Sequence, residues 1–333
     1  FFEQNETLDD SIAPFRELTS GAVDTLLRVS MRRSERWRKM KYDLKKNDEE
    51  IEESFYIPKE MTVFSWTGEI DTTMTPLDSM KYYKSFFRPG MMSMDPTNGY
   101  IKAWVGGMNY RHFQYDMVKK GKRQIGSTFK PFVYAAAIDQ LKLSPCDTFP
   151  DSQFCIEKNK FGNVEQWCPK NSGDKYGRTR TLKNALANSV NTVTARLMDR
   201  IGPRTVVKLA KDLGIEQRIL PVPSIALGTP DLSVYEMVAA YSTFANKGVY
   251  TQPVFIERID DKNGTTLYKN QPVTRDVLSE EAAYVTVNLL EGVTRAGSGT
   301  RLRTTGADEF NRAYQNVVTG LSLIHISEPT RPY

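Results

Sequence analysis

Two short motifs in this sequence combine residues that can carry out acyl transfer. The first is Ser127-Thr128-Phe129-Lys130, an S-x-x-K motif that opens an apolar stretch. Residues three apart lie on one face of a helix, so we expect the Lys130 ammonium to reach the Ser127 hydroxyl. A serine hydroxyl becomes a strong nucleophile when a neighbouring base takes its proton. Lysine can act as that base when burial lowers its pKa.

The second motif is Ser189-Val190-Asn191, an S-x-N match between two expected helices. Its hydroxyl can relay protons, and its amide can hold a substrate backbone. A simpler interpretation remains open, in which Ser127 caps the first helix and Ser189 or Asn191 caps the helix after it. A second S-x-x-K match at residues 172–175 lies in a loop rich in Gly and Asp, and we interpret it as chance.

The surrounding pattern predicts an α+β domain that positions these motifs. Residues 132–138 are apolar on nearly all sides, which predicts a helix buried in the middle of the domain. Further helices are expected over residues 181–187, 191–201, 203–213, 232–246 and 279–290, and strands over 61–66, 91–94, 100–105 and a hairpin at 255–268. Strands at both ends of a helical middle favour α+β over a parallel βαβ array.

Composition excludes some classes of protein. Of the 333 residues, 40% are hydrophobic and 26% charged, which is too apolar for a disordered chain. No stretch approaches the roughly 20 apolar residues needed to span a bilayer. Net charge is +5, and the basic residues concentrate between positions 28 and 46. Acidic residues follow at once, so we interpret this run as a solvated, salt-bridged helical linker rather than a nucleic-acid surface.

The three cysteines, Cys146, Cys155 and Cys168, lack C-x-x-C spacing, which argues against a zinc site. Cys155 and Cys168 flank a turn-rich stretch, so a hairpin there would bring the two thiols face to face. Both a disulfide and free thiols remain open for this pair. We expect no metal.

With both motifs in view, the sequence resembles the bifunctional, class A penicillin-binding proteins. Residues 123–132 resemble the family's nucleophile segment, residues 186–192 its second motif and residues 225–228 the segment that follows. S-x-x-K followed by a second Ser and Asn motif characterises this superfamily. The resemblance covers residues 86–320 and implies a penicillin-binding/β-lactamase-like transpeptidase fold, an antiparallel sheet packed against helices, with its C-terminal strands missing here.

The resemblance also implies a reaction. Ser127 would attack the D-Ala–D-Ala end of a peptidoglycan stem peptide, with Lys130 as general base. Ser189 would pass the proton to the leaving amine, and Asn191 would hold the donor peptide. An amine of a second stem peptide would then resolve the acyl-enzyme, whereas a β-lactam would stop at that stage. No cofactor and no nucleic acid is implied, and the parent protein would be membrane-anchored and act in the periplasm or on the outer face of the cytoplasmic membrane.

The sequence departs from the family in two respects. The family's third motif, K-T-G, does not occur, and Val318-Thr319-Gly320 is the nearest match. Residues 321–333 look like a translated adapter from DNA library preparation, so we expect a non-native tail. The expected organisation is a charged helical linker at 1–60 after a missing glycosyltransferase domain, an extended linker at 61–85, an incomplete transpeptidase domain at 86–320 and the tail at 321–333. This fragment is expected to be inactive for lack of K-T-G.

Several rival functions remain to be weighed. A Ser-His-Asp hydrolase would have to use His112, and the sequence contains no G-x-S-x-G. A β-lactamase and a D,D-carboxypeptidase share the serine chemistry, and a non-catalytic penicillin-recognising module needs only part of it. The sequence does not identify the acceptor amine, the oligomeric state or the protein partners.

Overall fold

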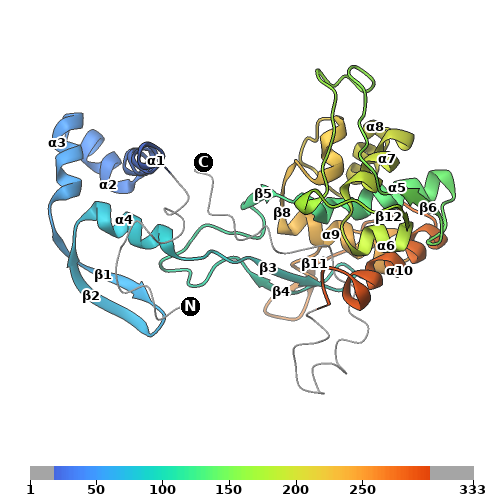
Figure 1. Cartoon of the computed structure of the whole chain (residues 1–333). Coiled ribbons are helices and arrows are strands. Elements are labelled where there is room, and N and C mark those ends of the chain that lie inside the picture. The colour runs from blue at the N-terminus through green and yellow to red at the C-terminus, as the bar shows by residue number, and fades with distance from the viewer. Residues whose placement is uncertain (1–18, 301–333) are drawn as a thin grey trace. The chain divides into compact units, whose positions relative to one another are not determined.

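The computed structural model describes residues 19–300, which belong to two compact units (Figure 1). The described part of the first unit comprises residues 19–89 and 107–114. Its elements are α1 (Ser20–Arg33), α2 (Glu35–Arg38), a π turn (Lys39–Asp43), α3 (Asp48–Glu53), a 3-10 turn (Ser54–Tyr56), β1 (Lys59–Ser65), β2 (Gly68–Met74) and α4 (Pro76–Ser85). Strands β1 and β2 form an antiparallel hairpin, and β1 includes most of the strand expected over residues 61–66.

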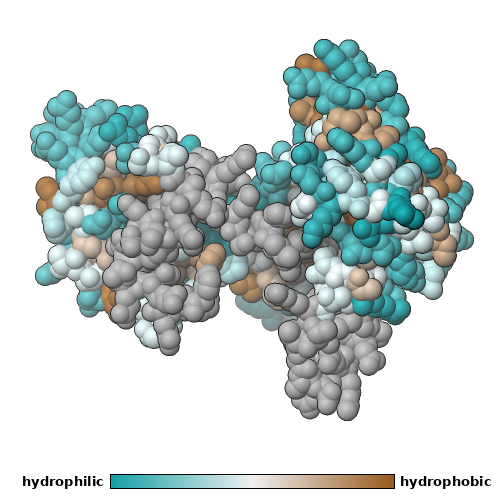
Figure 2. Space-filling view, viewed as in Figure 1, coloured by the Kyte–Doolittle hydropathy of each residue, from teal (hydrophilic) through white to brown (hydrophobic). Residues whose placement is uncertain are grey.

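The first unit has a small apolar core of its own. Met31, Trp37, Ile51 and Phe55 are buried together. The basic residues of the run are exposed apart from Arg36, which is half-buried. Hydrophilic residues also dominate the visible surface over α2 and α3 (Figure 2). Ion pairs join Lys39 to Glu35, Lys41 to Asp48 and Lys46 to Glu50 at 2.5–3.2 Å. The stretch that the sequence describes as a linker therefore carries both a salt-bridged surface and a folded core.

The described part of the second unit comprises residues 90–106 and 115–300. Its helices are α5 (Lys130–Leu141), α6 (Leu182–Ala187), α7 (Asn191–Ile201), α8 (Pro203–Asp212), α9 (Val234–Ala245) and α10 (Glu280–Ala296), with 3-10 turns at Gly126–Phe129, Ser172–Asp174 and Pro223–Leu227. Its strands are β3 (Met91–Met94), β4 (Ile101–Val105), β5 (Lys122–Gln124), β6 (Thr148–Pro150), β7 (Thr179–Thr181), β8 (Asp231–Ser233), β9 (Val249–Thr251), β10 (Arg258–Asp260), β11 (Thr266–Lys269) and β12 (Thr274–Asp276).

Antiparallel pairs join these strands two by two: β3 with β4, β5 with β8, β6 with β7, β9 with β12 and β10 with β11. Helices together with antiparallel strands confirm the predicted α+β class. The helix expected from residue 232 begins later, at Val234, because Leu232 pairs with Arg123 in the β5–β8 ladder. That pairing ties the chain just before Ser127 to the start of α9.

Helix α5 runs through the core of the second unit (Figure 1). Every residue from Lys130 to Ile138 is buried, as the apolar sequence predicts. Helices α7, α8 and α10 pack against it. Lys130 is the one charged side chain in that buried stretch, and its position at the first residue of α5 brings it to the candidate site. Across residues 19–300, no helix combines the length and hydropathy needed to cross a membrane.

Candidate active site

Ser127 lies in the 3-10 turn Gly126–Phe129, directly before α5. This turn is held by backbone contacts with residues distant in sequence. The Gly126 N–H donates to the Gly228 carbonyl at 2.9 Å, and the Tyr241 hydroxyl donates to the Thr128 carbonyl at 2.7 Å. Gly228 must be glycine, because a Cβ there would lie 1.8 Å from the Gly126 carbonyl oxygen. The nucleophile segment is therefore fixed by Gly228 before Ser127 and by Tyr241 after it.

Lys130 is fully buried, and this burial changes its acid–base chemistry. Its Nζ donates to the Ser189 carbonyl at 2.6 Å, to Ser189 Oγ at 2.9 Å and to Asn191 Oδ1 at 2.5 Å. Loss of solvation lowers the pKa of Lys130 from 10.5 to about 7. A lysine with that pKa exists in both protonation states near neutrality, as a general base requires.

Ser127 and Lys130 communicate through Ser189. The Ser189 hydroxyl donates to Ser127 Oγ at 3.0 Å and accepts from Lys130 Nζ. The S-x-x-K spacing led us to expect a direct approach of Lys130 to Ser127. The lysine instead directs its hydrogen bonds to the S-x-N segment, because Ser127 precedes α5 in a 3-10 turn rather than sharing a face of the helix.

The backbone at Ser189 is unusual for a residue with a side chain. Its φ is 54°, in the left-handed region. The Val190 N–H bonds to the Ala185 carbonyl and the Ser189 N–H to the Leu186 carbonyl, the two bonds of a Schellman motif that ends α6. Glycine usually occupies this position, so a serine here carries strain. The left-handed turn reverses the chain and places the Ser189 hydroxyl between Ser127 and Lys130.

Asn191 is the first residue of α7, and its amide bridges two segments. Its Oδ1 accepts from Lys130, and its Nδ2 donates to the Lys170 carbonyl at 2.6 Å. The interpretation that Ser127, Ser189 or Asn191 merely caps a helix was wrong. Val190 is the N-cap of α7, Phe129 is the N-cap of α5, and neither helix has a side-chain hydrogen bond from its own N-cap.

Other residues singled out in the sequence lie elsewhere. Ser172 and Lys175 of the second S-x-x-K match are both exposed. His112 belongs to the first unit, where its Nδ1 lies 3.0 Å from the Tyr83 hydroxyl and its Nε2 lies 2.8 Å from Glu69 Oε1. Both ring nitrogens of His112 therefore have structural partners, as expected for a residue outside the catalytic motifs.

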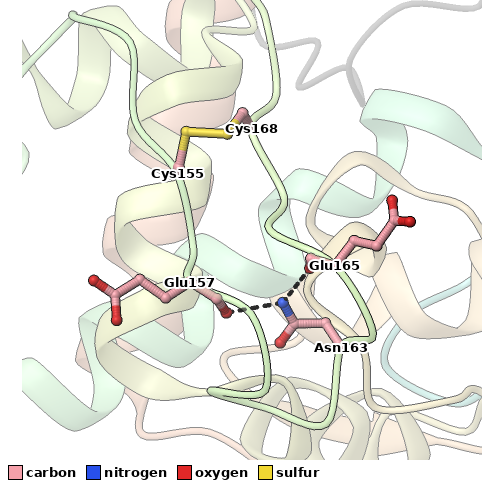
Figure 3. Close-up of a disulfide and its surroundings, with 5 residues drawn as sticks. All are labelled: Cys155, Glu157, Asn163, Glu165 and Cys168. Carbon is pink, nitrogen blue, oxygen red and sulfur yellow. Dashed lines mark hydrogen bonds between the residues drawn. A yellow bond between two sulfur atoms is a disulfide. The ribbon is translucent and has the colours of Figure 1, made fainter.

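The cysteine pair forms a disulfide. Cys155 and Cys168 are bonded (Figure 3), and Ile156 pairs with Trp167 immediately beside them. The alternative of free thiols was therefore wrong for this pair, whereas Cys146 is free and exposed. Only three residues lie between Asp151 and Cys155, and only two lie between Cys168 and Asn171, so the cross-link joins two segments that lead to the site.

Sequence reasoning missed a buried polar group beside α7. The carboxylate of Asp151 is fully buried and pairs with Arg180 at 2.6 Å. It also accepts from the side chains of Asn171 at 2.7 Å and Thr192 at 2.8 Å. Burial raises the pKa of Asp151, but the hydrogen bonds outweigh it and hold the pKa below its ordinary value. Neither Asp151 nor Asn171 belongs to a recognisable motif, so spacing offered no signal.

Comparison with known proteins agrees with this geometry. Residues 90–309, about two thirds of the chain, match the penicillin binding protein transpeptidase domain, and residues 10–87 match the penicillin-binding protein middle domain. The chain belongs to the penicillin-binding protein transpeptidase family. The motif residues Ser127, Lys130, Ser189 and Asn191 all lie within the matched transpeptidase segment.

Relatives within this family include penicillin-binding protein 1A of Aquifex aeolicus, 35% identical over 213 residues, 63% of this chain and 28% of the relative. Penicillin-binding protein 2D of Bacillus subtilis is 35% identical over 205 residues, 61% of this chain and 29% of the relative. The crystal structure of penicillin-binding protein 1A from Haemophilus influenzae matches with a TM-score of 0.60 and 25% identity, over 66% of this chain and 38% of that one. The chain thus spans less than a third of the length of these curated relatives.

Proposed function

We propose that this chain is the catalytic part of a peptidoglycan D,D-transpeptidase, which cross-links stem peptides during cell wall synthesis and is acylated by penicillin. The observation that carries the proposal is the hydrogen-bonded series Ser127 Oγ, Ser189 Oγ and Lys130 Nζ, at 3.0 and 2.9 Å, with a lysine pKa of about 7. These are the parts of a serine nucleophile activated through a relay. Family membership supports the same assignment.

The series can run in either direction. When Lys130 is protonated, it donates to Ser189, which donates to Ser127. When Lys130 is neutral, its lone pair can accept from Ser189, and Ser189 can in turn accept from Ser127. This reversed order removes the proton from Ser127 as it attacks. A pKa of about 7 keeps both orders populated at neutral pH, so the same groups can take up a proton and return it.

Acylation of Ser127 then proceeds by addition to the peptide carbonyl and release of the terminal D-Ala. Ser127 Oγ forms a bond to the carbonyl carbon of the penultimate D-Ala, and its proton passes to Lys130. The C–N bond to the terminal D-Ala breaks, and Ser189 returns the proton to the leaving amine. Asn191 holds the donor peptide through its side-chain amide. An amine of a second stem peptide attacks the ester and frees Ser127, whereas a β-lactam, whose leaving amine stays attached, stops at the acyl stage.

The third motif expected of the site, K-T-G, is not part of the hydrogen-bonded series of Ser127, Ser189 and Lys130. No K-T-G sequence occurs in the 333 residues, and the segment 301–333, with Val318-Thr319-Gly320, lies outside the described residues. Loss of one oxyanion donor costs about 10²–10³ in rate. We therefore propose that the fragment itself is acylated slowly or not at all. The parent protein would carry the K-T-G strand, an upstream glycosyltransferase domain and a membrane anchor, and would act outside the cytoplasm.

Labelling with a fluorescent penicillin tests this function. It is measured on two proteins, the chain as it stands and, on the proposal that residues 321–333 are a non-native tail, a protein continued beyond Gly320 by the sequence of the source gene. We expect time-dependent covalent labelling of the continued protein, mapped by mass spectrometry to the peptide that contains Ser127. The fragment should label slower by about 10²-fold or more, because the oxyanion site is incomplete.

Ser127→Ala should abolish labelling, and Ser172→Ala, in the second S-x-x-K match, is the matched control that should label normally. Incubation with a D-Ala–D-Ala stem peptide and an amine acceptor separates the rivals. A cross-linked product indicates a transpeptidase, release of D-Ala alone a carboxypeptidase, and rapid turnover of penicillin a β-lactamase. A continued protein that forms no covalent adduct would leave only a non-catalytic module.

A further inference from the structure

We propose that Asn171 is a positioning residue for the Ser189-Val190-Asn191 segment, an inference that rests on the proposed function. Asn171 precedes the 3-10 turn Ser172–Asp174 and is distant in sequence from α7. Its side chain nevertheless supplies the cap that α7 lacks. By holding the first turn of α7, Asn171 sets where the Asn191 amide and the Ser189 hydroxyl lie relative to Ser127.

The cap bonds are direct. Asn171 Oδ1 accepts from the backbone N–H of Asn191 at 2.9 Å and from that of Thr192 at 3.2 Å. The first N–H groups of a helix have no partner within the helix and need an acceptor from outside it. The N-cap residue itself is Val190, whose side chain cannot accept a hydrogen bond. Asn171 therefore does from another segment what a local Ser, Thr, Asp or Asn does in most helices.

The residue before Asn171 fixes the side chain of Asn191. The Lys170 carbonyl accepts from Asn191 Nδ2 at 2.6 Å, while Lys130 donates to Asn191 Oδ1. These two contacts determine which end of the amide faces Lys130 and leave one Nδ2 hydrogen for a substrate carbonyl. Lys170 and Asn171 together thus hold both the backbone and the side chain of Asn191.

The orientation of the Asn171 amide is set in turn by Asp151. The buried Asp151 carboxylate accepts from Asn171 Nδ2 at 2.7 Å, so the oxygen of that amide must face α7. Thr192 Oγ1 donates to the same carboxylate at 2.8 Å, and the Gly177 N–H donates at 3.0 Å. Asp151 is therefore bonded both to the residue that caps α7 and to α7 itself. The carboxylate has enough donors to remain ionised while buried.

The segment that carries Asn171 is itself restrained. The disulfide between Cys155 and Cys168 joins its upstream and downstream parts, as Figure 3 shows. In the loop beyond the disulfide, Asn163 Nδ2 donates to the carbonyls of Glu157 and Glu165 at 2.9 and 2.7 Å. Asn163 thus stabilises the same loop as a side chain that bonds to backbone, but its bonds remain within the loop. It is a matched control for Asn171.

The test compares Asn171→Ala with Asn163→Ala in the protein continued beyond Gly320, kept oxidised. Amide hydrogen exchange of the peptide that contains Asn191 and Thr192 should become faster in Asn171→Ala and stay at the wild-type rate in Asn163→Ala. The second-order rate of acylation by fluorescent penicillin should fall by about 10- to 100-fold in Asn171→Ala, because a small displacement of a positioned group has that effect. Asn163→Ala should remain within about 2-fold.

Asn171→Ser, which keeps a short acceptor, should restore part of both losses and guards against a variant that fails to fold. A structural role alone would lower the melting temperature of both alanine variants without separating their acylation rates. Normal acylation in Asn171→Ala, with the wild type reactive, would overturn this inference and leave the proposed function standing. No acylation in the wild type would overturn the proposed function, and the role inferred for Asn171 with it.

Discussion

Replacing Lys130 with methionine should change how the stability of the protein depends on pH. In the unfolded chain Lys130 keeps its proton up to about pH 10.5, whereas burial lowers its pKa to about 7 in the folded state. Between these values the unfolded state binds more protons, so the stability of the wild type rises with pH. Below pH 7 both states are protonated, and the folded state carries the full cost of a buried ammonium.

The magnitude follows from the interval between the two pKa values. At about 1.4 kcal/mol per pH unit, the pH-dependent contribution of Lys130 is of order 5 kcal/mol over the whole interval. It is about 2 kcal/mol between pH 7 and pH 9, because the folded lysine is already half neutral at pH 7. Lys130→Met lacks this contribution. Its free energy of unfolding minus that of the wild type should therefore fall by about 2 kcal/mol from pH 7 to pH 9.

Urea denaturation of both proteins at several pH values measures this difference directly. Other titrating groups cancel because they are common to the two proteins. Lys175→Met is the control, since Lys175 is exposed. Its difference from the wild type should be flat across the same range. A flat difference for Lys130→Met as well would refute the idea that burial prepares this lysine to act as a base.

Three further predictions concern the backbone around the site. Ser189→Gly should be more stable to denaturant than Ser189→Ala by about 1 kcal/mol, because the backbone φ of residue 189 is 54° and glycine adopts it without strain. Both variants lose the hydroxyl relay, and equal stabilities would contradict the inferred strain. Reducing the Cys155–Cys168 disulfide, with the third cysteine blocked, should lower the free energy of unfolding by about 3 kcal/mol in a urea titration; an unchanged midpoint would count against it. Gly228→Ala should lower the free energy of unfolding by at least about 3 kcal/mol, because its Cβ would lie 1.8 Å from the Gly126 carbonyl oxygen. Gly126→Ala has open space for its Cβ and should lower it by about 1 kcal/mol. Similar melting temperatures for the two variants would refute the steric argument.

The sequence predicted the parts of the site that depend on local spacing. The apolar run after Ser127 and Lys130 identified the buried helix that begins at Lys130, although the lysine bonds to Ser189 and Asn191 rather than directly to Ser127. The S-x-N segment was found as a second motif, but its hydrogen bonds with Lys130 were not foreseen. The buried α5 and the hairpins were predicted for the same reason, because apolar runs and turn residues act locally.

The supporting groups could not be found in this way. Asp151 and Asn171 act across long stretches of chain, and an isolated carboxylate or amide in a polar loop looks solvated until folding buries it. The left-handed conformation of Ser189 was hidden because the residue is not glycine. The disulfide was left open, since only the paired Ile156 and Trp167 show that the two cysteines face each other.

The left-handed backbone at Ser189 also restricts which hydroxyl can stand in the relay. Threonine carries the same functional group, but its β-branch makes a positive φ a genuine outlier, more costly than for serine. A change from Ser to Thr at this position would keep the hydroxyl but destabilise the left-handed turn that ends α6. The choice of serine over threonine in this motif is therefore explained by the shape of the main chain, independently of any contact with substrate.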